Sequence, residues 1–158
     1  MQENVLIFRS AKHYIVENLI NELKKQGDKS ISLVVQDESK SHYGNETSLN
    51  LIIYPEGFFH YQTLIQNDDV KEKLSKIEYD KIYVPYSTAK PKVEEVEKII
   101  VHVLGQKEIY LYDKFGNVKK HHINMLKYAL FQKCEQLKHH IVAAMFHLLG
   151  IWYMRGIK

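Results

Sequence analysis

Cysteine is almost absent from this chain. Its 158 residues contain one, Cys134, so no disulfide can form within the chain, which suits a reducing compartment. Because Cys134 lies on an apolar helical stripe, we expect a buried structural thiol rather than a reactive one. The first residues, MQENVLIFRS, hold no charged leader followed by a long apolar stretch, so no signal peptide is expected. We therefore predict a cytoplasmic protein, with membrane association left open.

A strong excess of either charge is also missing. The formal net charge is +3, from 22 Lys and Arg against 19 Asp and Glu, and the two signs are interleaved. Nucleic-acid-binding proteins more usually show a concentrated basic face, so we expect no nucleic-acid partner. The chain has no internal repeat and no Pro/Gly-rich linker, and its length suits one domain with a substantial core. We place an α/β domain at 1–120 and a helical arm at 121–158, as part of that domain or as a docking element.

The motifs of the common cofactor sites are absent. The stretch FRSAKHYI (8–15) contains no glycine, whereas a dinucleotide-binding fold uses G-x-G-x-x-G there so that the pyrophosphate can approach the backbone. No P-loop occurs, and we expect no cofactor. Ser10, Lys12 and His13 could still contact a substrate through their side chains, or they are exposed residues at a helix start.

Metal-ligand spacings are missing as well, although the chain has nine histidines. The adjacent pairs His121-His122 and His139-His140 would diverge on a helix and could not easily share one ion. No H-x-x-x-H, H-E-x-x-H or cysteine cluster is present. We expect no metal site. For the pair beside the apolar C-terminal segment, a cationic rim facing phosphate head groups is the functional alternative.

What the chain does contain is a regular alternation of strand and helix patterns. Apolar runs predict five strands at 4–9, 32–36, 50–54, 81–85 and 108–113, and helical periodicity predicts helices at 13–26, 69–77 and 91–104. This alternation is typical of a parallel sheet with right-handed crossovers. We predict an α/β, Rossmann-like, mostly parallel five-stranded sheet with the first strand central and a long C-terminal helical arm. Ligands would then bind beyond the carboxyl ends of the strands.

The loop after the fourth predicted strand contains Ser87-Thr88-Ala89-Lys90, which matches the S-x-x-K pattern of serine acyl-enzymes. That chemistry needs the lysine one helical turn after the serine. Pro91 directly follows Lys90 and pushes it toward extended geometry, so we reject the acyl-enzyme. Ser87, Thr88 and Lys90 remain candidates for phosphate binding; alternatively, Ser87 or Thr88 only caps the following helix.

One acid–base pair is conceivable in the stretch PEGFFHYQ (55–62), whose structure we do not assign. Glu56 and His60 would be a carboxylate and an imidazole suited to proton transfer. The alternative is that both serve packing and the surface. A hydrolase would require these two side chains to meet in a deep pocket.

From Ile123 onward the pattern is helical to the end of the sequence. Its last part, IVAAMFHLLGIWYM (141–154), is almost wholly apolar but shorter than the roughly 20 residues that a spanning helix needs. We expect either a core or oligomer-forming helix or one that binds a membrane surface. The residues expected to contact the membrane or partner are Met145, Leu148, Trp152, Tyr153 and Arg155.

Three segments carry a resemblance to a known class. NVLIFRSAKHYIVENLINELKKQG (4–27), YDKIYVPYS (79–87) and VEEVEKIIVHVLGQKEIYLYDKFGNV (93–118) resemble the N-terminal Rossmann-like half of GT-B class glycosyltransferases, especially heptosyltransferase-like ones, and small surface-polysaccharide proteins. Those enzymes carry a Gly-Asp pair where this chain has Ser10-Ala11-Lys12-His13. Their second domain, which binds the nucleotide sugar, has no counterpart here.

The resemblance implies a glycosyltransferase-related protein of cell-surface polysaccharide assembly. It would act as a half-cleft or accessory subunit, with a partner or at the membrane, toward a nucleotide sugar or a lipid-linked sugar. Whether it is itself an enzyme stays open. The alternative is a non-catalytic Rossmann-like interaction module that dimerises with a second copy through its C-terminal helix.

Overall fold

A computed structural model describes residues 2–27, 29–55, 57–89, 91–106, 108–130 and 133 of the chain. The chain divides into two units, Met1–Ile123 and Asn124–Lys158. The first unit contains every strand of the sheet described below. In the second, residues 125–130 are helical, and the predicted long C-terminal arm otherwise lies outside the described residues.

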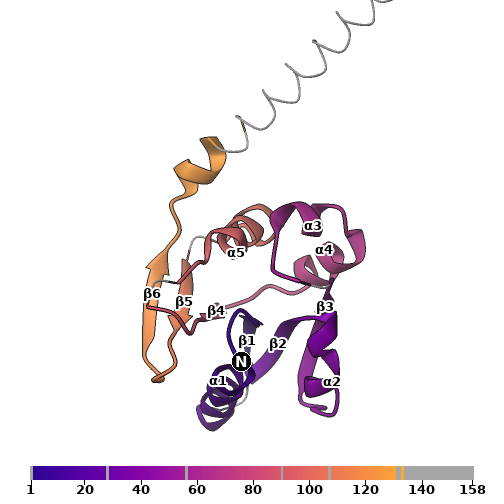
Figure 1. The fold of residues 1–158 in the computed structure, drawn as a ribbon, viewed down its shortest axis with the longest axis vertical. Coiled ribbons are helices and arrows are strands. Elements are labelled where there is room, and N and C mark those ends of the chain that lie inside the picture. Colours follow the sequence, from indigo (N-terminus) through magenta and orange to yellow (C-terminus); the bar gives the residue numbers. More distant parts are fainter. Residues whose placement is uncertain are drawn as a thin grey trace, which may run out of the picture. The chain divides into compact units, whose positions relative to one another are not determined.

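The first unit is built on a six-stranded sheet with the order β3-β2-β1-β4-β5-β6 (Figure 1). Its strands are β1 (Glu3–Phe8), β2 (Lys29–Gln36), β3 (Leu49–Tyr54), β4 (Lys81–Pro85), β5 (Glu108–Tyr112) and β6 (Val118–His122). The first five are mutually parallel, and β6 pairs with β5 in the antiparallel sense. The order is that of doubly wound nucleotide-binding sheets, with β1 central as predicted.

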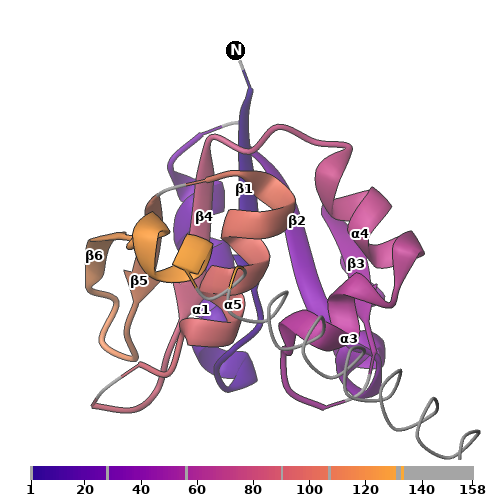
Figure 2. The ribbon, with the colours of Figure 1, turned by 90° about the horizontal axis from the view of Figure 1, so that it is seen from above.

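Helices cover both faces of this sheet. They are α1 (His13–Lys25), α2 (Lys40–Tyr43), α3 (Tyr61–Ile65), α4 (Asp68–Ser75) and α5 (Glu94–Ile99), with a short 3-10 turn η1 (Asp37–Ser39) before α2 and a π-helical turn η2 (Ile100–Leu104) after α5. Figure 1 shows α1 and α2 on one face and α3, α4 and α5 on the other, and in Figure 2 α5 lies in front of the sheet and α1 behind it. The first unit is thus a three-layered α/β domain.

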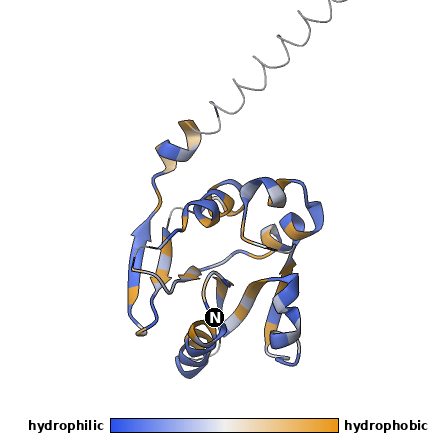
Figure 3. Cartoon of the chain, viewed as in Figure 1, coloured by the Kyte–Doolittle hydropathy of each residue, from blue (hydrophilic) through white to orange (hydrophobic). Residues whose placement is uncertain are grey.

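The buried strands and helix stripes follow from the apolar pattern. Val5, Leu6, Ile7 and Phe8 are completely buried, as expected for a central strand covered on both faces. The five apolar positions of α1 that recur at helical spacing are all buried: Ile15, Val16, Leu19, Ile20 and Leu23. Figure 3 shows apolar residues in the inner strands, whereas the edge strand β6 and much of the helices are polar.

Two sequence predictions about the sheet and its last helix need correction. The sheet has six strands rather than five, because the polar segment Val118–His122 forms an edge strand. The predicted 91–104 helix begins only at Glu94. Its end was predicted correctly: Gly105 has φ 65°, a left-handed conformation that favours glycine after a helix.

Candidate functional site

The carboxyl ends of the parallel strands form one edge of the sheet, which we call the carboxyl edge. At β1 and β4 the chain leaves this edge toward opposite faces, into α1 and α5 respectively, which makes this the switch point where such folds bind ligands. The Ser10 hydroxyl donates to the Pro85 carbonyl, with 2.6 Å between the oxygens. Ser10 therefore ties the end of β1 to the end of β4, and its hydroxyl serves the backbone.

Arg9, the residue directly after β1, is held by a buried side chain. Its Nε donates to Oε1 of Gln36 over 2.8 Å, and Gln36, the last residue of β2, is only 5% exposed. Among the residues that the structure describes, no carboxylate forms an ion pair with Arg9. A guanidinium has five N–H donors in a planar fork. The Gln36 bond fixes the orientation of this fork while leaving it a net positive charge.

His13, the first residue of α1, meets a tyrosine from the neighbouring connection. Its Nδ1 lies 3.1 Å from the hydroxyl of Tyr43 in α2. Burial raises the pKa of Tyr43 to about 12, so the phenol keeps its proton at neutral pH. We assign the hydrogen of the neutral imidazole to Nε2, the tautomer in which Nδ1 accepts from the Tyr43 hydroxyl. Burial, followed by the nearby His42 and Arg9, lowers the pKa of His13, while Glu17 opposes this shift.

His42, the neighbour of Tyr43 in α2, completes the group. Its Nε2 contacts Oε1 of Glu17 at 2.5 Å, and because a carboxylate only accepts, Nε2 carries the hydrogen. The His13 and His42 ring centroids are 4.1 Å apart. We call this set the rim cluster; its members are Arg9, His13, Glu17, Gln36, His42 and Tyr43.

The start of α1 adds unpaired backbone donors beside the rim cluster. Lys12 is the N-cap residue, and neither a side-chain capping bond nor an acidic residue in the first turn is present. Free N–H groups at a helix start, together with the helix dipole, favour negative charge. By contrast, Asn67 caps α4 by accepting from the Val70 amide, so that helix start is already satisfied.

The structure brings some of the predicted site residues together. Ser10, Lys12 and His13 lie in or directly before α1, beside the rim cluster, while Ser87 and Thr88 are exposed in the connection after β4. Glu56 and Lys90 lie outside the described residues, as do the tail positions Met145, Leu148, Trp152, Tyr153 and Arg155.

The carboxylate that faces His60 in the described chain comes from α5. Glu95 Oε2 is 3.9 Å from His60 Nδ1 and accepts a hydrogen bond from the Tyr61 amide at 3.0 Å. The other carboxylate oxygen of Glu95, Oε1, forms an ion pair with Lys98. The Glu95 carboxylate therefore joins the start of α3 to α5 and has a structural role.

The residues missed by the sequence reasoning are Arg9, Glu17, Gln36, His42 and Tyr43. A usable signal existed for two of them. Phe8 and Val34 are register partners in the β1–β2 ladder. Arg9, one residue after Phe8, and Gln36, two residues after Val34, therefore fall close together at the strand ends. His42 and Tyr43 come from the polar connection DESKSHYG, where no periodicity predicts a helix.

The adjacent pair His121-His122, expected to diverge on a helix, instead lies on strand β6. Its side chains point to opposite faces. His121 Nε2 contacts Oε1 of the buried Glu97 at 2.7 Å, and His122 Nδ1 contacts Oε1 of Glu108 at 3.0 Å. Both imidazoles therefore attach the edge strand to its neighbours.

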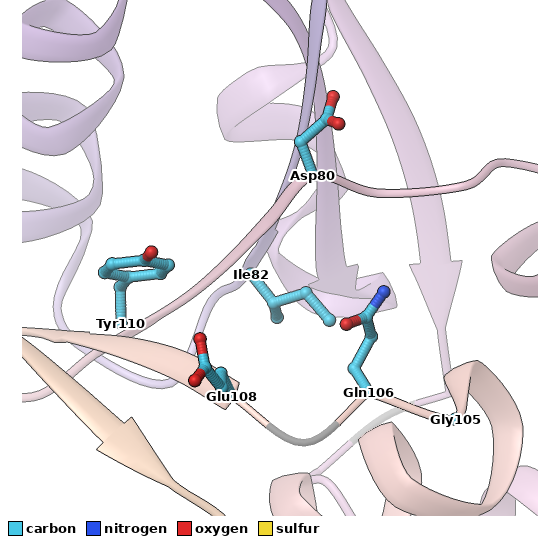
Figure 4. A pocket seen from close by; sticks show the side chains of 6 residues that line it. All are labelled: Asp80, Ile82, Gly105, Gln106, Glu108 and Tyr110. Atoms are coloured by element: carbon cyan, nitrogen blue, oxygen red, sulfur yellow. The ribbon is translucent and has the colours of Figure 1, made fainter.

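A hollow of about 400 Å³ lies at the opposite, amino-terminal edge of the strands, lined by Asp80, Ile82, Gly105, Gln106, Glu108 and Tyr110 (Figure 4). Its polar groups already have partners: Asp80 accepts from the Asn4 amide, Gln106 donates to the Tyr79 carbonyl, and Glu108 pairs with Lys120. We therefore place the candidate site at the carboxyl edge, where Arg9 has no carboxylate partner among the residues that the structure describes.

Within the described ranges, no group of three or more histidine, cysteine or acidic side chains is arranged to hold a metal ion. None of the helices in those ranges has the length and apolar character needed to cross a membrane. Comparison of the chain with family models, with curated proteins and with solved structures gives no match.

Proposed function

We propose that this chain is a glycosyltransferase-related component of cell-surface polysaccharide assembly that binds an anionic sugar donor, a nucleotide sugar, at the rim cluster. The observation that carries the proposal is Arg9. Its guanidinium is oriented by the buried Gln36 and has no carboxylate partner in the described part of the chain. It lies at the edge where open α/β sheets bind their ligands.

A guanidinium in this state is suited to phosphate. Its planar fork matches phosphate oxygens in a bidentate arrangement. The Nε bond to Gln36 uses one donor of Arg9 and leaves the two terminal nitrogens for a ligand. Because the buried Gln36 already holds the Arg9 side chain in place, Arg9 loses little conformational freedom when a ligand binds, which favours affinity.

The surroundings of Arg9 support an anion as the ligand. The uncapped start of α1 supplies backbone donors, and the exposed Lys12 adds positive charge. Glu17 is the one acid of the rim cluster, and its carboxylate is engaged by His42. The sum of these charges favours a phosphate group over a cation.

Under this proposal the unit Met1–Ile123 supplies one side of a two-sided binding site. The class that the chain resembles binds its donor between two Rossmann-like domains. We therefore propose that a partner, or a second copy of the chain, contributes the other side of this site. Transfer chemistry would then belong to the assembled pair.

The anion site can be tested on the full chain by isothermal titration calorimetry with a uridine diphosphate sugar. We expect Arg9→Lys, which keeps the charge but loses the fork, to weaken binding about tenfold or more. The matched control is Lys76→Ala, which removes an exposed cation paired with Glu72 after α4 and should leave the affinity unchanged. Equal affinity of wild type and Arg9→Lys, or no binding by wild type at millimolar ligand, would reject the donor site.

We propose in addition that the apolar segment 141–154 attaches the protein to a membrane surface. If this segment binds the membrane surface, Leu148→Glu in the full chain should reduce co-sedimentation with vesicles containing anionic lipid by about tenfold or more. Leu126→Glu is the control, because Leu126 is 69% exposed in the helical stretch 125–130. Light scattering on both variants separates the alternatives: loss of a dimer without any lipid binding would indicate an interface between copies instead.

A further inference from the structure

The hydrogen bond between Tyr43 and His13 joins a phenol that stays neutral to an imidazole that can titrate. With the hydrogen of the neutral imidazole assigned to Nε2, the Tyr43 hydroxyl donates to Nδ1 of His13, with 3.1 Å between the two atoms. The bond in this direction exists only while Nδ1 lacks a proton. Its state is therefore coupled to the charge of the imidazole.

The groups that face His13 make a second positive charge unfavourable in the empty site. They are Arg9 from the β1–α1 connection, Glu17 on α1, and His42 and Tyr43 on α2. The His42 ring is 4.1 Å away between centroids. Burial and the charges of His42 and Arg9 lower the pKa of His13, against the opposing effect of Glu17. The imidazole is consequently neutral at neutral pH.

An anion bound by Arg9 would reverse this balance. Its negative charge offsets the repulsion between Arg9 and a protonated His13, and so favours the charged imidazole. Once Nδ1 carries a proton it donates, and the Tyr43 oxygen accepts. The Tyr43 O–H group can then turn toward another acceptor. The phenol stays protonated, because burial raises the pKa of Tyr43 to about 12.

We propose that binding of a phosphate or sulfate group at the rim cluster takes up one proton from solvent on Nδ1 of His13 and turns the Tyr43 hydroxyl from His13 to the anion. The only new covalent bond is N–H on the imidazole. The site thus binds anions more tightly as the pH falls through the neutral range. This inference rests on the proposed anion site and adds His13 and Tyr43 to its donors.

The test is calorimetry of the full chain with sodium sulfate, and with a uridine diphosphate sugar, in two buffers of different ionisation enthalpy. Neither ligand changes its own charge between about pH 6 and pH 8, so the difference in heat reports protons taken up by the protein. We expect wild type to take up about half a proton or more per bound anion near pH 7, with a pH-dependent affinity.

Three variants assign this uptake. His13→Gln offers Tyr43 an amide oxygen but cannot titrate, and it should bind with almost no uptake. Tyr43→Phe should weaken binding about tenfold and still take up the proton. His102→Gln is the matched control: burial also lowers the pKa of His102, but it stacks on Tyr61 in the layer over the other face of the sheet, and its replacement should change neither quantity. NMR titration of the His13 ring in wild type, with and without sulfate, gives the same information without a variant.

The possible failures are distinct. If wild type binds neither ligand, the proposed function falls and this inference falls with it. Binding without proton uptake, or uptake that persists in His13→Gln and disappears in His42→Gln, overturns the inference and leaves the anion site in place. An unchanged affinity in Tyr43→Phe removes the proposed role of its hydroxyl.

Discussion

Replacing Phe8 by alanine is expected to lower the free energy of unfolding by about 3–5 kcal/mol. Phe8 ends β1 and is completely buried. Its ring meets Phe59 edge to face, with 5.4 Å between centroids, and Phe59 in turn packs against Tyr54 at 5.0 Å. Truncation would open a cavity at the centre of this aromatic set and loosen the β3–α3 connection that Phe59 anchors.

The chain offers a matched control in Phe58, the neighbour of Phe59. Phe58 is 84% exposed, so Phe58→Ala should change stability by no more than about 0.5 kcal/mol. Urea unfolding followed by circular dichroism measures both variants. Similar losses for Phe8→Ala and Phe58→Ala would mean that the Phe58 ring also packs into the core, contrary to its 84% exposure.

Tyr54→Phe is expected to cost about 1–3 kcal/mol, although it removes a single oxygen. The Tyr54 hydroxyl donates to the carbonyl of His60 at 2.7 Å and accepts from the amide of the same residue at 2.9 Å. Tyr54 is completely buried, and burial raises the pKa of its hydroxyl, so the phenol stays neutral. Its loss leaves both backbone groups of His60 without this partner.

Amide hydrogen exchange tests whether the effect of Tyr54→Phe is confined to the surroundings of His60. In Tyr54→Phe the His60 amide should exchange markedly faster than in wild type, whereas amides of β1 should change only as far as global stability falls. Tyr14→Phe serves as the control, because Tyr14 is 49% exposed on α1. If the His60 amide kept its protection in Tyr54→Phe, this hydrogen-bond pair would not be what closes the connection.

The sequence predicted the elements that lie in the buried interior, where helices cover both faces of the sheet. β1 and β2 read as apolar runs because helices cover both faces of the sheet there, and the apolar stripe of α1 gives helical spacing for the same reason. β6 gives no such signal. Its residues VKKHH are polar, and its position is fixed by backbone pairing to β5 and by ion pairs to Glu97 and Glu108, which periodicity does not reveal.

Sequence reasoning placed residues that follow a strand near the carboxyl edge, and it missed the contacts between distant parts of the chain. Ser10, Lys12 and His13 were identified because the rim of a parallel sheet is where ligands bind. The contact between His13 and Tyr43 joins residues 30 positions apart through the short helix α2, which forms in a polar connection. Such a contact depends on how that connection folds back over α1, and no local pattern encodes it.

The direction and composition of β6 also bear on how the protein behaves at high concentration. Its outer side presents unpaired backbone groups, which in many proteins recruit another strand and lead to aggregation. Here the strand is five residues long and carries Lys119, Lys120 and the two histidines. A second copy approaching this side would bring like charges together and strip water from them. The sheet is thereby protected against growing into a fibre from its β6 side.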